Sequence, residues 1–352
     1  MRLVSEAEGM PMKNERLKIF MGRHRSTIIA YFVMLVVLVL FAFNQQDFFT
    51  RYGPQSVFNQ VITLCIATLG QTIVILTSGI DLSVGSLIVF LNCVMATIMQ
   101  PIIDGCGGNT LAGVLITCLI MLVLGAVCGA FNGVLVVYGR LQPIVVTLAT
   151  GSIFSGLSRY VRPSPGGKVV SSFARFMTGR VFEFIPMSAI VLLAAVVLIW
   201  LPYRSSRNGQ ALYAIGGNEN AAYLSGIKIN QAKLLAYIIA GLCSGLNAIL
   251  LTAQIRSGDP TAPNNFTNNS IAAAALGGVA LSGGKGSYFG AMAGAIILSL
   301  IVGLLIFWKI SSFYQNLIQG VILILALSVD VIGSLAQRLH KKRIPGVAAM
   351  ED

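Results

Sequence analysis

Long apolar runs alternate with short polar segments along most of the chain, from Thr27 to Gly333. Each run is roughly 17–25 residues long, enough for an α-helix to cross a hydrocarbon core about 30 Å thick. The pattern predicts an all-α polytopic membrane protein, with a transmembrane domain over 27–333 between two tails, 1–26 and 334–352. We expect about ten transmembrane helices, near 27–43, 58–77, 83–103, 111–138, 143–158, 186–202, 233–254, 270–282, 288–307 and 313–333.

Two glycine-rich segments interrupt the apolar pattern, TSGIDLSVGS at 77–86 and LGGVALSGGKGS at 276–287. In the first, Asp81 can cap a helix that begins at Leu82. This segment is either a helix cap that faces the cytoplasm or a broken, re-entrant element, because backbone at membrane depth is tolerated where it lines a watery cavity. The second segment contains a turn at 283–286, which leaves the eighth predicted span short.

Composition supports a membrane location. Of the 352 residues, 56% are hydrophobic and 10% are charged, whereas soluble domains carry about 25% charged residues. The net charge of +12 would suggest nucleic acid in a soluble protein, but here the basic residues flank apolar runs, so we expect no nucleic-acid partner. With the N-terminus inside, 16 of the 24 Lys and Arg residues are cytoplasmic, as the positive-inside rule expects. Both termini and the loop 203–232 are then cytoplasmic.

Neither a catalytic nor a metal-binding pattern emerges from the sequence. Between Asp47 and Asp330, acidic residues occur only in predicted loops or at span ends, and the six cysteines have neither metal-ligand nor disulfide spacing. The segment around Lys285 fails the ATP-binding loop pattern, because Val279 stands where Gly is needed and Gly286 where Ser or Thr is needed. We expect no enzyme activity, no metal and no cofactor bound by this chain. Energy for pumping must then come from a partner.

The segment YAIGGNENAAYLSGIKI at 213–229 builds a small, polar and sharply bounded element. Asn218 can accept a backbone N–H as an N-cap, and Glu219 places a negative charge at the positive helix end. Gly226 can turn left-handed, so a helix that starts at Glu219 closes after about two turns. The element is either a cytoplasmic loop with an incidental helical turn or a coupling helix that transmits force to a partner.

A row of small residues marks the fourth predicted span. Gly125, Gly129 and Gly133 are spaced four apart on one helical face. Such residues let a neighbouring backbone approach closely. We therefore expect this span to be buried in the bundle.

Two segments of the chain are similar to each other. GAVCGAFNGVLV at 125–136 aligns with AGLCSGLNAILL at 240–251 at a constant offset of 115, which pairs Asn132 with Asn247. The similarity is either an inverted internal repeat or a coincidence among Gly, Ala and Leu. The two asparagines either join helices by hydrogen bonds or line a cavity.

Five motifs occur in order along the chain: ILTSGIDLSVGS (75–86), GRLQPIVVTLAT (139–150), YAIGGNENAAYLSGIKIN (213–230), AAAALGGVALSGGKGS (272–287) and YQNLIQGVILILALSVD (314–330). Taken together, they resemble one family, the membrane permease subunits of bacterial ABC importers for monosaccharides of the ribose, galactose and xylose type. The resemblance covers nearly the whole chain from Phe58 to Asp330.

The resemblance implies a homodimer with a central translocation path, in which a cytoplasmic loop of each subunit docks on a separate ATPase subunit that binds ATP and Mg. It places Asp81 and Ser83 near the path, with Asn132 and Asn247 as further candidates. Where the family usually has an acidic residue, this chain has Asn269 or Ser270, and Asn269 is also a candidate for the path. The residues that correspond to the ATPase-coupling loop are Gly216, Gly217, Asn218, Glu219, Ala221, Ala222, Leu224, Ser225 and Gly226.

The expected function is import of a monosaccharide across the bacterial inner membrane, with the solute delivered by a periplasmic binding protein. A path without buried charge suits an uncharged solute, since no counter-ion is needed. Two alternatives remain. The same machinery can carry a nucleoside, a polyol or a signalling sugar, or the chain can be a self-sufficient secondary carrier or channel.

Overall fold

The computed structural model describes residues 25–45, 48–50, 52–262 and 265–311, together with 314, 315, 317–322, 324 and 328. The predicted tail 334–352, nearly all of the predicted tail 1–26 and most of the predicted span 313–333 lie outside these residues.

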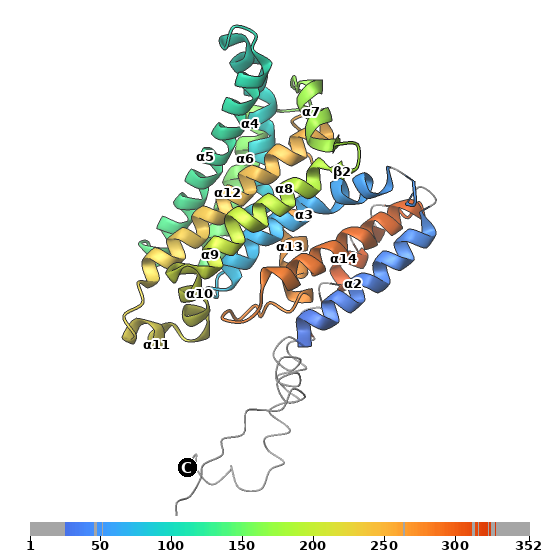
Figure 1. Cartoon of the computed structure of the whole chain (residues 1–352). Coiled ribbons are helices and arrows are strands. Elements are labelled where there is room, and N and C mark those ends of the chain that lie inside the picture. The colour runs from blue at the N-terminus through green and yellow to red at the C-terminus, as the bar shows by residue number, and fades with distance from the viewer. Residues whose placement is uncertain are drawn as a thin grey trace, which may run out of the picture.

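Eight helical segments in the described ranges are long and apolar enough to cross a membrane. They overlap eight of the predicted spans and differ from them mainly at the ends, so the prediction of an all-α polytopic membrane protein is confirmed. They are α2 (Arg25–Asn44), α3 (Gly53–Ile75), α4 (Val84–Gly105), α5 (Thr110–Val137), α6 (Pro143–Val161), the run of α8 (Met187–Ala195), a π-helical turn (Val196–Trp200) and α9 (Leu201–Ser205), α12 (Ile229–Ile255) and α14 (Tyr288–Phe307) (Figure 1).

The predicted span 270–282 is wrong as a membrane crossing. The structure has instead α13 (Phe266–Leu276), whose 11 residues reach only about 16 Å, half of the hydrocarbon core. The helix ends where Gly277 packs so closely on α14 that an added Cβ would overlap the backbone of Gly290. The next residue, Gly278, has a φ of +82° and turns the chain away. The glycine-rich segment 276–287 therefore ends this helix before it can cross the membrane.

The helix after the first glycine-rich segment, 77–86, begins at a different residue from the one predicted. The helix expected from Leu82 begins two residues later, as α4 at Val84. The Asp81 carboxylate accepts hydrogen bonds from the backbone N–H of Ser83 at 2.8 Å and from its hydroxyl at 2.6 Å. These bonds hold Ser83 at the N-cap position and delay the first helical turn.

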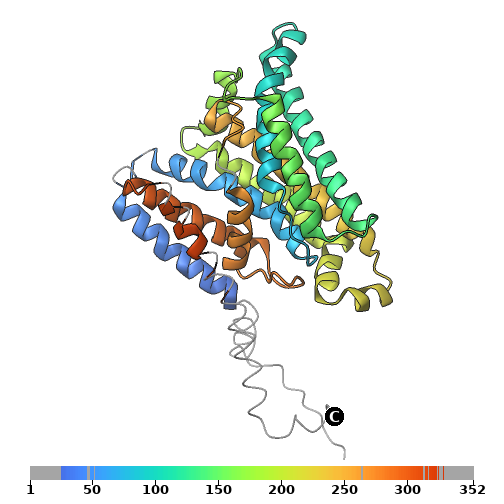
Figure 2. The ribbon, with the colours of Figure 1, turned by 180° about the vertical axis from the view of Figure 1, so that it is seen from behind.

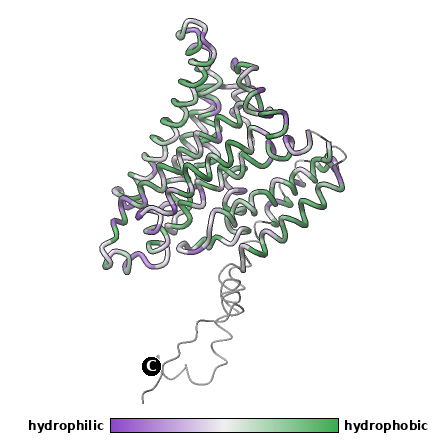
Figure 3. Tube along the Cα trace, in the orientation of Figure 1, coloured by the Kyte–Doolittle hydropathy of each residue, from purple (hydrophilic) through white to green (hydrophobic). Residues whose placement is uncertain are grey.

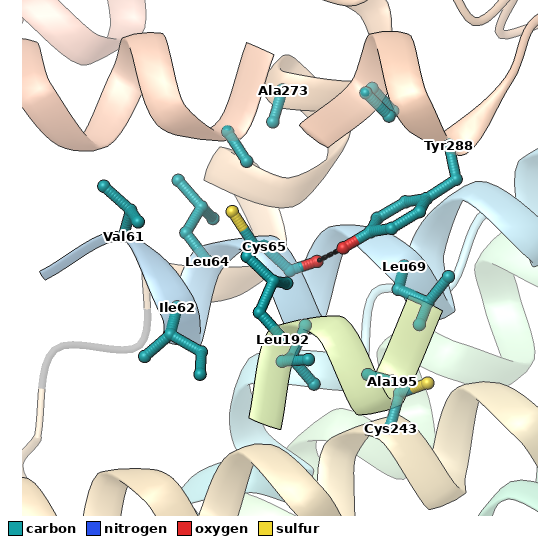
Figure 4. Packing of buried hydrophobic residues seen from close by; sticks show 14 of the residues in the cluster. Val61, Ile62, Leu64, Cys65, Leu69, Leu192, Ala195, Cys243, Ala273 and Tyr288 are labelled. Atoms are coloured by element: carbon teal, nitrogen blue, oxygen red, sulfur yellow. Dashed lines mark hydrogen bonds between the residues drawn. The ribbon is translucent and has the colours of Figure 1, made fainter. Parts of the chain in front are cut away.

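α3 is the most deeply buried of the spans, with α12, α14, α13 and α8 packed around it. The largest cluster of buried apolar side chains joins Ile62, Cys65 and Leu69 of α3 to Leu192 of α8 and Tyr288 of α14 (Figure 4). The Tyr288 hydroxyl donates to the backbone carbonyl of Cys65 at 3.1 Å. Burying a hydroxyl without a partner costs free energy, so this bond makes an aromatic side chain compatible with the core.

α5 and α12 approach each other along a row of glycines. Gly125 meets Gly241 and Gly245, whereas Gly129 meets Gly241 and Tyr237, so the two helices run antiparallel. A Cβ added at Gly129 would overlap the carbonyl oxygen of Tyr237. The close approach predicted for the glycine row is therefore confirmed, but the prediction that this span is buried in the bundle is wrong, because only the side of α5 that faces α12 is buried.

The opposite face of α5 is apolar and exposed. Leu115, Leu119, Val123 and Val127 recur every four residues on it and are each more than half exposed. A helix face of this kind suits contact with lipid. Figure 3 shows hydrophobic residues along the long helices and hydrophilic ones at their ends.

Short elements lie at the two ends of the bundle (Figure 1). α10 (Arg207–Gly217) and α11 (Glu219–Leu224) connect α9 to α12 at one end. At the opposite end, α7 (Ser171–Thr178) precedes a small hairpin of β1 (Arg180–Val181) and β2 (Ile185–Pro186), in which Arg180 pairs with Pro186.

Candidate coupling surface and solute cavity

The ends of α11 follow the local sequence. The Asn218 side chain accepts a hydrogen bond from the backbone N–H of Ala221 at 3.0 Å, and the helix begins at Glu219. Gly226 has a φ of +77°, which favours glycine, and the next N–H, of Ile227, returns to the carbonyl of Ala222 at 3.1 Å. The predicted cap, starting residue and left-handed closure are confirmed.

α11 presents large apolar side chains to solvent. Tyr223 is 72% exposed and Leu224 is 85% exposed. Ala222, by contrast, is buried against Ala211 and Ile215 of α10. The buried side anchors the short helix, and the exposed side is available to a partner.

Two further features fix α11 and shape its surroundings. Glu219 forms an ion pair of 2.7 Å with Lys233 of α12. A hollow of about 840 Å³ lies beside the helix, lined in part by Asn218, Tyr223 and Tyr138 from the end of α5.

The hydroxyl of Tyr213 on α10 is partly buried. Burial raises the pKa of this hydroxyl, and the positive charge of Arg204 opposes the rise.

Three motifs that lie far apart in the sequence meet next to α10. The Ser78 hydroxyl lies 2.7 Å from the carbonyl of Ser282 and 3.3 Å from that of Gly216. The N–H of Gly284 donates to the carbonyl of Leu76 at 3.1 Å. We call this contact of residues 76–78, 216–217 and 282–284 the glycine junction. It connects the coupling loop to the end of α3 and to the turn before α14.

Neighbouring glycines of the predicted coupling motif have different surroundings. A Cβ at Gly216 would overlap the carbonyl oxygen of Leu76 and the backbone N of Gly284, whereas a Cβ at Gly217 would have no atom within 4 Å. Gly216 and Ala222 therefore face their own protomer. The other coupling residues are solvent-exposed, namely Gly217, Asn218, Glu219, Ala221, Leu224, Ser225 and Gly226.

Asp81, Ser83 and Asn132 form one buried network. The Ser83 hydroxyl donates to the Asp81 carboxylate and accepts a hydrogen bond from the Asn132 amide at 2.8 Å. Asp81 lies between α3 and α4, where burial raises the pKa of its carboxyl and the hydrogen bonds from Ser83 oppose the rise. The network joins the start of α4 to α5. It does not line the cavities described below.

Asn247 also acts between helices. Its amide donates to the backbone carbonyl of Thr63 on α3 at 2.7 Å, and the residue is fully buried. Neither Asn132 nor Asn247 lines any of the cavities described here, so the interpretation of the two residues as cavity-lining groups finds no support in these cavities. Both serve as hydrogen-bonding contacts between helices, the commoner use of asparagine in membrane proteins.

Asn269 is the one predicted path residue that lines a large cavity. This cavity, of about 670 Å³, lies between α3, α13 and α14. Sequence reasoning found Asn269 and missed the glutamine side chains that share the cavity. They are Gln45, Gln60, Gln315 and Gln319. Gln60 lies within an apolar span. In a membrane protein, an amide at such a position is expected to face the interior of the helix bundle, so the sequence did contain a signal for this residue.

A second cavity lies on the other side of α13. It has a volume of about 620 Å³ and is lined by Thr267 and Asn268 of α13 and by Ser152, Ser155 and Arg159 of α6. Figure 2 shows α13 between α14 on one side and α4 with α6 on the other. The polar first half of α13 therefore separates two cavities.

The structure combines a bundle of helices long enough to span a membrane, two cavities beside the short helix α13, and an exposed short helix at one end, as expected of a membrane transport subunit. The comparisons agree with this class. The family described as "Branched-chain amino acid transport system / permease component" matches residues 53–327, so the chain belongs to this permease family. It is the permease component of a bacterial ABC import system, and the ATPase and the binding protein of such a system are separate partners.

Several curated proteins are similar over most of their length. The ribose import permease protein of Escherichia coli (strain K12) is 35% identical over 302 residues, which cover 84% of this chain and 91% of the relative. The ribose import permease protein of Bacillus subtilis (strain 168) is 32% identical over 303 residues, 84% of this chain and 90% of the relative. The D-allose transport system permease protein of Escherichia coli (strain K12) is 30% identical, over 85% and 90% respectively. No solved structure matches the chain.

Proposed function

We propose that this chain is the permease subunit of an importer that carries a monosaccharide into the cytoplasm, driven by ATP hydrolysis in a separate subunit. The proposal that this chain couples to a separate ATPase rests on the structure of α11. Both of its ends are fixed by local structure, and Tyr223 and Leu224 project from it into solvent. Exposed aromatic and aliphatic side chains on a rigid element are typical anchors of a protein interface.

The nature of the solute follows from the relatives and from the cavity at Asn269. The relatives named above carry ribose and allose in their names. The lining of the cavity contains amide and hydroxyl side chains and no Asp, Glu, Lys or Arg among the described residues. An amino acid would bring a carboxylate and an ammonium group that need counter-charges. A neutral sugar needs only hydrogen bonds.

A second copy of the chain would complete the path. Ser152 and Arg159 lie exposed on α6, one face of a spanning helix, and line the cavity beside Asn268. Contact of these groups with lipid would be unfavourable. Water between two protomers would solvate them, which supports a homodimer with a central path.

Transport assays test the proposed function. Proteoliposomes with this chain, its ATPase and its binding protein should take up ribose, D-allose or galactose only with ATP. Uptake driven by an ion gradient without the ATPase would show a secondary carrier instead. Uptake of a nucleoside or polyol in preference to all three sugars would support the alternative solutes.

Reporter fusions test the orientation. A fusion at Gly217 or at His340, which lies outside the described residues, should read cytoplasmic, and one at Gly166 should read periplasmic. This follows from the distribution of Lys and Arg. A cytoplasmic signal at Gly166 would contradict the proposed topology.

A pair of alanine variants tests the docking face. Ala221 is exposed and Ala222 is buried, so Ala221→Trp should leave the protein folded but reduce co-purification of the ATPase. Ala222→Trp should instead lower the yield of folded protein, because the cluster with Ala211 and Ile215 has no space for an indole ring. Normal ATPase binding and uptake for Ala221→Trp would rule out α11 as the docking element.

A further inference from the structure

We propose that each protomer holds its own binding site for a neutral, polyhydroxylated solute, in the cavity between α3, α13 and α14. This inference rests on the proposed function and adds to it a site within the permease. Its volume, about 670 Å³, lies in the range of about 300–1,000 Å³ that is typical of small-molecule sites.

The side chains of the cavity fit a sugar. Six amides line it: Gln45, Gln60, Asn265, Asn269, Gln315 and Gln319. An amide carries hydrogen-bond donors and an acceptor without a charge. A sugar hydroxyl both donates and accepts, so an amide-rich lining can satisfy several hydroxyls at once while remaining neutral in the membrane.

Part of this lining is held in place by the helices. The Gln60 amide donates to the backbone carbonyl of Ser299 at 2.8 Å, and the Gln315 amide donates to that of Ile310 at 2.8 Å. Gly303 of α14 gives the Gln60 amide its space, since an added Cβ there would overlap the amide nitrogen. The amides are thus oriented before a solute arrives, which reduces the entropy lost on binding.

Apolar groups form another part of the wall. Phe266 and Phe307 line the cavity together with Leu64 and Leu298. The ring carbons of a sugar carry C–H groups that form an apolar face, and an aromatic ring can cover such a face. Most of the lining surface is apolar, and amides set in an apolar wall suit the usual composition of a small-molecule pocket.

The cavity lies away from the coupling loop. α14 begins at Tyr288, directly after the turn that contacts Gly216, and Ser299 and Phe307 follow 11 and 19 residues later. At a rise of 1.5 Å per residue, these two residues lie about 16 Å and 28 Å along the helix from its start. The cavity therefore occupies the half of the membrane on the side from which an importer receives its solute.

Two adjacent asparagines separate this site from the other cavity. Asn269 lines the amide cavity, and Asn268 lines the cavity beside α6. Leucine is similar in size to asparagine and cannot hydrogen-bond. Asn269→Leu therefore removes one amide from the cavity between α3, α13 and α14 and leaves Asn268 in place.

The experiment uses proteoliposomes with the complete transporter and labelled ribose, D-allose and galactose. Asn269→Leu should lower uptake of the transported sugar by about threefold to tenfold, the loss expected for one or two hydrogen bonds to a neutral group. Stimulation of the ATPase by the sugar-loaded binding protein should stay at the wild-type level. Val127→Leu, on the exposed apolar face of α5, should change uptake by less than about twofold. Val302→Trp should block uptake, because Val302 lines the same cavity.

Cysteine labelling gives a readout independent of uptake. In Asn269→Cys, the transported sugar should slow the reaction with a membrane-impermeant maleimide, and leucine at the same concentration should not. Wild-type uptake in both Asn269→Leu and Val302→Trp would overturn the inference and leave the proposed function intact. So would labelling that no sugar slows. A wild-type transporter that imports none of the three sugars would overturn the proposed function and this site together.

Discussion

The contact between α5 and α12 and the glycine junction are both built from glycine, but the glycines serve different purposes. In the first, Gly125 and Gly129 are ordinary helical residues whose missing Cβ lets two long helices touch along their backbones. In the second, Gly283 and Gly284 have φ values of +88° and +71°, and the segments meet through hydrogen bonds of the backbone and of Ser78.

This difference separates a rigid part of the molecule from a part suited to movement. Close helix packing involves many atoms, and a small displacement forfeits many contacts at once. The glycine junction involves few groups, and three chain segments join there without a shared helix. If the ATPase docks on α11, as we propose, a force applied there would reach α3 and α14 through the junction while the α5–α12 contact stays fixed. The following variants test this division.

The largest effect should come from the rigid contact. In Gly129→Leu, the side chain would meet the backbone of Tyr237 and Gly241, and the clash should exceed the about 1–3 kcal/mol of ordinary overpacking because backbone cannot move aside. We expect a strong loss of folded protein, measured by yield of monodisperse protein in detergent. Val127→Leu is the control, since Val127 is 57% exposed on the same helix. Normal yield of Gly129→Leu would show that α5 and α12 separate easily.

The junction should affect transport more than folding. Gly216→Ala places a methyl group against the carbonyl of Leu76 and the N–H of Gly284, which should separate the coupling loop from α3 and the turn before α14. Uptake should fall by about tenfold or more, corresponding to a loss of about 1.4 kcal/mol, while the yield of folded protein changes little. Gly217→Ala has open space and should remain active. Equal uptake by Gly216→Ala and Gly217→Ala would mean that the glycine junction does not transmit movement between the ATPase and the spanning helices.

A smaller effect is expected at the end of α11. Valine at position 226 must adopt a φ near +77°, which costs about 1–3 kcal/mol for a residue that is not glycine. Gly226→Val should fray the helix end and weaken co-purification of the ATPase. Gly226→Asn should restore binding in part, because asparagine tolerates the left-handed region. If both variants bind the ATPase as the wild type does, the shape of this end is unimportant for docking.

The smallest effect concerns the ion pair of α11 with α12. Glu219 is 53% exposed, so Glu219→Gln should reduce stability by less than about 1 kcal/mol. The difference from the wild type should shrink as salt is added, because salt screens exposed charges. Thermal unfolding at two salt concentrations measures it. A large, salt-independent loss would show that the pair holds the coupling loop in place.

The amino-acid sequence by itself determined the features that depend on neighbouring residues. Apolar runs fixed eight spans, Asn218 and Gly226 fixed the ends of α11, and the spacing of Gly125 and Gly129 marked a face for close packing. Each is set by helix periodicity or by a hydrogen bond within a few residues, so local order is enough to predict it.

Only the tertiary structure decided which distant segments meet. It placed Gly216 against Leu76 and Gly284, ended α13 against α14 before it could cross the membrane, and brought Gln60 and Gln319 into one cavity. Gly216 lies 140 positions from Leu76 and 68 from Gly284, and Gln60 lies 259 positions from Gln319. No local rule states which helix will pack on which, because that choice depends on how all the apolar faces and backbone hydrogen bonds are satisfied together.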